Sequence, residues 1–113
     1  MIQSTDEINE ALAGFTDVIS LETVAAGAQW SYDLRITLAN SSGKAVVLHC
    51  EDVSSLHISE FGGGLTQFLV LRGRDVREKQ LDRVRFHFCD LERGAIAFDC
   101  VTADVAEQRD QNL

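Results

Sequence analysis

Three histidines and one aspartate are the residues of this chain whose types could do chemistry together. His49, His57, His87 and Asp99 each occupy a polar position in a stretch where polar and apolar residues alternate. Imidazole nitrogens and a carboxylate can ligate a metal ion or exchange protons with a substrate. Their spacing matches no metal-binding signature, because each lies on a different expected strand. Two interpretations stay open: a ligand or metal site on the polar face of a sheet, and an ordinary solvated face with cross-strand ion pairs.

The cysteines and the triple glycine give no stronger catalytic signal. Cys50 and Cys100 fall on apolar positions and are expected in the core, whereas Cys89 falls on a polar position two residues from His87. A thiol beside an imidazole can act as a nucleophile, but no oxyanion-stabilising feature accompanies this pair. The glycines at 62–64 lack the following lysine and helix of a phosphate-binding loop. We therefore expect no cofactor and no enzymatic activity.

Size and composition narrow the class of protein. The 113 residues, 45% hydrophobic and 25% charged, fit one globular domain. A net charge of −8 argues against binding nucleic acid or an anionic membrane, both of which need clustered lysine and arginine. Three cysteines without a CxxC pair do not form a disulfide framework, and the acidic start does not resemble a signal peptide. We expect a cytoplasmic protein.

The acidic residues are concentrated in the first half of the chain. Residues 1–60 hold nine acids and two bases, whereas residues 61–113 hold nine acids and eight bases. Such asymmetry steers encounters with an oppositely charged partner, and it can equally serve solubility alone. If it is functional, the expected partner-binding residues are Asp6, Glu7, Glu10, Asp17, Glu22, Glu51, Asp52 and Glu60.

The elements that must position these residues follow from hydrophobic periodicity. Ser4 and Glu7 have the spacing of a helix capping box, and apolar residues then recur at helical intervals, which predicts a helix over about residues 5–13. The period changes to two over residues 30–51, with a turn around Gly43, which predicts a β-hairpin. One face of its first strand carries Trp30, Tyr32, Leu34, Ile36 and Leu38.

A second hairpin is predicted over residues 83–104, where Phe86, Phe88, Ile96 and Phe98 alternate with polar residues around a turn at Gly94. Shorter strands are expected over residues 18–24, 53–58 and 68–71. In the second of these, Leu56 and Ile58 are expected to point inward, and the third is expected to be covered on both faces. An exposed turn is expected near residues 77–81 and a frayed tail over 107–113. The predicted fold is a single α+β domain, mainly antiparallel β. It has a short N-terminal helix and about six or seven strands, over residues 15–105, forming a curved sheet, sandwich or partly open barrel.

The second half resembles a pattern found in small β-rich bacterial proteins, some of which are immunity partners of secreted toxins. It is carried by Phe61-Gly62-Gly63-Gly64 and by the alternation from Val84 to Cys100. The resemblance covers roughly residues 30–105, implies a bacterial origin and a non-enzymatic role, and transfers no functional residue.

The leading hypothesis is that this small protein binds a basic protein partner through an acidic surface, as an immunity protein binds its toxin. Self-association into a homodimer is a variant of it, because the edge strands of a sheet offer unpaired backbone groups. The alternative is the ligand- or metal-binding β-domain, which requires His49, His57, His87 and Asp99 to converge.

Overall fold

Two antiparallel sheets and one helix make up the computed structural model, which describes residues 3–26, 31–76 and 85–108. The helix α1 spans Thr5–Leu12. The strands are β1 (Asp17–Ala26), β2 (Ser31–Ala39), β3 (Ala45–Glu51), β4 (Ser54–Ile58), β5 (Leu71–Asp75), β6 (Phe86–Asp90), β7 (Ile96–Cys100) and β8 (Thr102–Glu107). The predicted α+β class is confirmed. The described residues form eight strands rather than six or seven, since the second predicted hairpin ends at Cys100 and, after a bend at Val101, β8 begins at Thr102.

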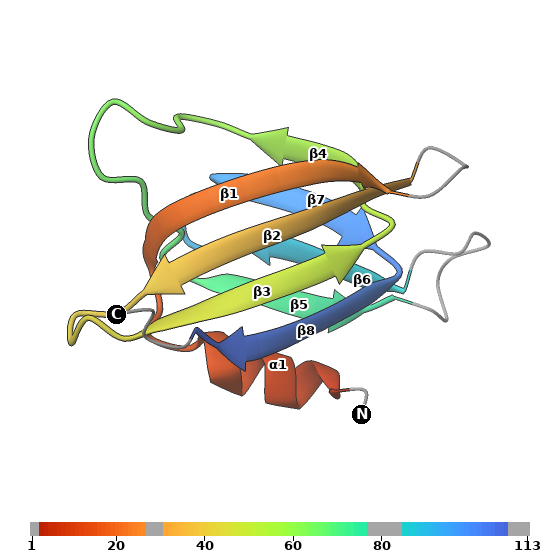
Figure 1. The fold of residues 1–113 in the computed structure, drawn as a ribbon, viewed down its shortest axis with the longest axis horizontal. Coiled ribbons are helices and arrows are strands. Elements are labelled where there is room, and N and C mark those ends of the chain that lie inside the picture. The colour runs from red at the N-terminus through yellow and green to blue at the C-terminus, as the bar shows by residue number, and fades with distance from the viewer. Residues whose placement is uncertain (1–2, 27–30, 77–84, 109–113) are drawn as a thin grey trace.

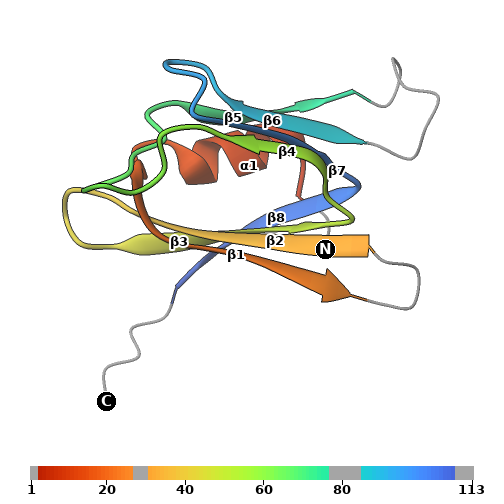
Figure 2. The ribbon, with the colours of Figure 1, turned by 90° about the horizontal axis from the view of Figure 1, so that it is seen from above.

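The two sheets face each other as the layers of a sandwich (Figures 1 and 2). The first, which we call sheet A, has the strand order β1-β2-β3-β8, and the second, sheet B, has the order β4-β7-β6-β5. Every pair of neighbouring strands is antiparallel. Both predicted hairpins are confirmed, as β2–β3 and β6–β7, and Gly43 and Gly94 supply positive φ angles of 86° and 66° at their turns.

Alternating apolar residues of both sheets fill the space between the layers. Phe88 and Phe98 are fully buried, and their rings stack with centroids 5.2 Å apart. Removing this apolar area from water is the main term that stabilises the sandwich. The buried core from the strands of both sheets is Leu34, Ile36, Leu38, Val46, Leu48, Cys50, Leu71, Phe86, Phe88, Ile96, Phe98, Cys100, Ala103 and Val105.

The helix α1 closes one open side of the sandwich, next to the edge strands β8 and β5 (Figure 1). Its capping box is confirmed: Ser4 Oγ accepts from the Glu7 N–H, and the Glu7 carboxylate accepts from the Ser4 N–H. Ile8 and Leu12 are buried in the core. A helix of this length is not stable alone in water, so its apolar face must be packed against the sheets.

Two side-chain amides complete the hydrogen bonding of those edge strands. The amide of Gln3 accepts from the Val105 N–H at 2.7 Å and donates to the Val105 carbonyl at 3.0 Å. Asn9 does the same for Gly73, accepting at 2.8 Å and donating at 3.0 Å. Each amide presents one acceptor and one donor, as a neighbouring strand would, so the backbone at the centre of β8 and of β5 is satisfied.

Two of the expected short strands need correction. Residues 68–71 do not form a strand: Phe68 is buried, a turn follows, and Leu71 begins β5. The Asp90 carboxylate holds this turn by accepting from the Val70 N–H at 3.0 Å. Leu56 is exposed rather than inward, because the register of β4 shifts between Ser54 and His57. Trp30, the expected turn at 77–81 and residues 109–113 of the expected tail lie outside the described residues.

Candidate partner-binding face

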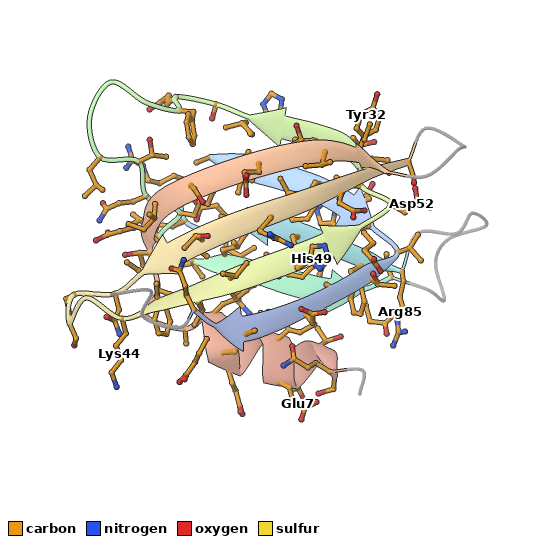
Figure 3. The ribbon with its side chains drawn as sticks, in the orientation of Figure 1. Glu7, Tyr32, Lys44, His49, Asp52 and Arg85 are labelled. Atoms are coloured by element: carbon orange, nitrogen blue, oxygen red, sulfur yellow. The ribbon has the colours of Figure 1, made fainter. Side chains whose placement is uncertain are left out.

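The outer face of sheet A carries several acidic groups that point away from the core. The strand register brings Glu22 of β1, Arg35 of β2, His49 of β3 and Asp104 of β8 into one row across the sheet. Arg35, His49 and Asp104 alternate along their strands with buried apolar residues, and Glu22, paired with Arg35, is itself exposed, so this row lies on the outer face of the sheet. Figure 3 places His49 on β3, in the front sheet.

A second acidic row lies beside the first. Asp33 of β2 carries a carboxylate 3.8 Å from His49 Nε2, and Glu51 of β3 accepts a hydrogen bond from Thr102 Oγ1 at 2.7 Å. With Glu22 and Asp104, this face holds four carboxylates against one guanidinium, that of Arg35. We call Glu22, Asp33, Glu51 and Asp104 the acidic face. Its negative potential would attract a basic surface.

The outer face of sheet B has the opposite character. Arg72 and Arg74 of β5 lie opposite Cys89 and His87 of β6. On the neighbouring strand β7, the carboxylate of Asp99 is hydrogen-bonded to His87 Nδ1 at 2.8 Å. The sandwich therefore presents an acidic face on one side and a basic face on the other.

The structure does not bring the four residues of the proposed metal site together. His49 lies on the outer face of sheet A, whereas His57, His87 and Asp99 lie on sheet B. Only His87 and Asp99 are in contact, since His57 lies opposite Ala97. A different set, Asp33, His49 and Glu51, has ligand atoms within 4.8 Å of one another, but it is an open group on a sheet surface.

The predicted partner-binding acids fall into separate groups. Glu22 and Glu51 lie on the acidic face. Exposed Asp6, Glu7 and Glu10 lie on α1, at the lower margin of the molecule, where Figure 3 labels Glu7.

Of the other three predicted acids, Asp17 begins β1, whereas Asp52 and Glu60 lie at bends next to β4. Asp17 is tied to Gln67, whose Nε2 donates to its carboxylate at 2.8 Å. Asp52 and Glu60 have positive φ angles of 55° and 56°. Asp33 and Asp104 are missing from the predicted set, although each lies between two apolar residues, a pattern that indicates an outward-facing position.

A groove of about 540 Å³ lies between α1 and residues 69–72. Its apolar wall includes Leu12, Phe15 and Leu71, and Asp6 and Glu10 lie along its rim with Arg72. The mixed charges of this rim distinguish it from the acidic face.

The cysteines have the environments that their positions predicted. Cys50 and Cys100 are fully buried, and Cys89 is half-buried on the outer face of sheet B. Burial, with the neighbouring Cys100 thiol as a further cause, raises the pKa of Cys50 well above its ordinary value. Cys50 therefore stays a neutral thiol, which suits a core residue and not a nucleophile. The glycines at 62–64 form an exposed loop with positive φ angles.

A small sandwich with two oppositely charged outer faces defines a protein suited to binding another protein. Comparison with known families is specific: the model of the family "Immunity protein PIM8" matches residues 2–104. The chain belongs to that family. No curated protein and no solved structure matches it. In the described residues, no helix is long and apolar enough to cross a membrane.

Membership supports the immunity-protein interpretation in general. It implies a protein partner such as a toxin, and it suggests a non-enzymatic role. The resemblance drawn from the second half of the sequence is thereby confirmed, and the match extends it through the N-terminal helix.

Proposed function

We propose that this protein neutralises a bacterial toxin in the cytoplasm by binding a basic surface of the toxin with the acidic face of sheet A. The observation that carries the proposal is the separation of charge between the two sheets. Four carboxylates lie on one outer face with a single arginine, and the arginines of β5 lie on the other. Separated charges orient the encounter and exclude partners of the wrong sign.

The acidic face is a better binding surface than the acids of α1 for a structural reason. Its carboxylates are fixed on neighbouring strands of a four-stranded sheet, so little conformational entropy is lost when a partner binds. Asp6, Glu7 and Glu10 lie on a two-turn helix, and Glu7 is already engaged in the capping box. We assign the helix acids, with Asp17, Asp52 and Glu60, a role in long-range attraction.

Two charge-matched triple variants test this assignment. The face variant combines Asp33→Asn, Glu51→Gln and Asp104→Asn, and the helix variant combines Asp6→Asn, Glu7→Gln and Glu10→Gln. Both change the net charge by three, and both keep side-chain size, while glutamine preserves the capping box. The binding partner is the purified candidate toxin domain encoded by the gene immediately upstream of the gene for this protein, and the measurement is calorimetric titration.

The face variant is expected to bind at least about tenfold more weakly than the wild-type protein, and the helix variant within about threefold of it. Equal losses for the two variants would mean that only net charge matters. A loss confined to the helix variant would move the binding site to α1. Wild-type protein that does not bind this toxin domain at all would refute the proposed function.

A further inference from the structure

The four edges of the two sheets differ in how well they are protected. The edges of β8 and β5 are closed by the amides of Gln3 and Asn9, which occupy the backbone N–H and C=O of Val105 and Gly73. Exposed strand edges invite other strands to pair with them, and native proteins commonly block them. The N-terminal segment thus protects one side of the sandwich and leaves the opposite side, with β1 and β4, without this protection (Figure 1).

Of the two remaining edges, β4 is a poor template for a further strand. It has five residues, its register shifts between Ser54 and His57, and Ser55 has a φ of 55°. An irregular strand cannot offer evenly spaced hydrogen-bonding groups to a neighbour.

The strand β1 is longer and regular over most of its length. Its beginning is covered by residues 66–68, with the Val18 N–H donating to Thr66 and the Phe68 N–H donating to Thr16, both at 2.9 Å. After an irregularity between Val18 and Ser20, residues 20–26 pair with β2 without interruption. Among the described residues, no strand lies on the other side of these seven positions.

The surroundings of this edge are apolar and acidic. Ile19 and Val24 of β1 are 62% and 57% exposed, and Leu65, next to Thr66, is 68% exposed. Glu22 lies in the middle of the open run and belongs to the acidic face. A strand added here would extend that face, so its outward side chains would lie beside a carboxylate.

We propose that residues 20–26 of β1 receive an extended segment of the toxin, rich in basic and apolar residues, as a fifth strand of sheet A. Main-chain hydrogen bonds would supply affinity, and side chains on alternate positions would supply specificity. The inference rests on the proposed function, since it assigns the toxin a particular mode of contact with sheet A and its edge.

Hydrogen exchange of backbone amides tests the inference directly. In the free protein, alternate amides of residues 20–26 point away from β2, and these are expected to exchange quickly. Saturation with the purified toxin domain is expected to slow these amides by at least about tenfold and to leave the amides of β4 unchanged.

A proline variant provides the second measurement. Proline is placed at position 23 or 24, whichever amide exchanges quickly in the free protein, because this choice leaves the pairing with β2 intact. The variant is expected to keep the wild-type circular dichroism spectrum and to bind at least about tenfold more weakly. Ser41→Pro is the control, since Ser41 is the second residue of the exposed β2–β3 turn, a position that suits proline, and this turn connects β2 to β3 rather than to β1.

The outcomes separate the two proposals. Two results would overturn the strand addition and leave the proposed function standing. One is tight binding of the wild-type protein with no change in the exchange of residues 20–26, and the other is full affinity of the folded proline variant. Protection of these amides that rises with protein concentration in the absence of toxin means that a second copy of this chain occupies the edge, and it also overturns the inference. Absence of any binding refutes the proposed function itself.

Discussion

At the scale of single residues, two side-chain amides form the hydrogen bonds that a neighbouring strand would otherwise form. Gln3 and Asn9 stand in for a neighbouring backbone at the exposed edges of β8 and β5, and each forms both a donor and an acceptor hydrogen bond. These contacts join the N-terminal segment to strands 102 and 64 residues away in sequence. They thereby connect α1 to both sheets at once.

Replacement of Asn9 by alanine should destabilise the protein although alanine favours the helix. Both backbone groups of Gly73 would lose their partners, which costs about 1–3 kcal/mol for a partly buried site. Urea denaturation measures the loss, and Glu10→Ala on the same helix is the control, with a change expected within about 0.5 kcal/mol. An Asn9→Ala variant as stable as wild type would show that water satisfies the edge of β5 equally well.

Thiol reactivity provides a second test at this scale. The native protein is expected to react quickly with a thiol reagent at Cys89 alone, because Cys50 and Cys100 are fully buried. The raised pKa of Cys50 keeps it protonated as pH increases through the usual range for thiols, so its reactivity stays low at pH 9. Mass spectrometry after labelling locates the modified residue. Rapid labelling of Cys50 in the folded protein would contradict the described core.

At the scale of elements, the close approach of β5 to β6 depends on one glycine. A Cβ atom on Gly73 would lie 2.7 Å from Cε2 and 2.8 Å from Cζ of Phe88. The Phe88 ring cannot move freely, because it is fully buried and stacks on Phe98. The absence of a side chain at position 73 thus allows the Phe88 ring to pack against this strand.

The variant Gly73→Ala should therefore be destabilised by about 1–3 kcal/mol through overpacking. Combining it with Phe88→Leu should recover part of that loss, since the smaller side chain makes room for the added methyl group. Thermal unfolding of the two single variants and the double variant measures the coupling. Strictly additive effects would mean that the cost arises elsewhere than at the Phe88 ring.

The sequence predicted these elements where alternation was strict. The hairpins over residues 30–51 and 83–104 were recognisable because their strands each have one continuous apolar face and each hairpin has a glycine at its turn. The prediction was wrong at residues 68–71, where an apolar run of four has no periodicity and a distant carboxylate, Asp90, holds a turn. Leu56 was misplaced because a register shift is invisible in the pattern of a five-residue strand.

At the scale of the whole molecule, the proposed binding surface depends on strand order. The charge of each residue is known from the sequence, but His49 and Asp104 become neighbours only because β8 pairs with β3. The same order places His87 and Asp99 on the opposite sheet from His49, which separates the proposed metal-binding set. The excess of acids in residues 1–60 is visible in the sequence, whereas the basic face formed by Arg72 and Arg74 of β5 was not predicted.

Neutralisation of the toxin in living cells tests the central claim most directly. The candidate toxin domain encoded by the gene immediately upstream is co-expressed with the wild-type protein, the face variant or the helix variant, at equal and verified levels of folded protein. The account predicts that the wild-type protein and the helix variant restore growth, whereas the variant carrying Asp33→Asn, Glu51→Gln and Asp104→Asn does not. Full protection by that face variant would contradict the assignment of toxin binding to the acidic face of sheet A.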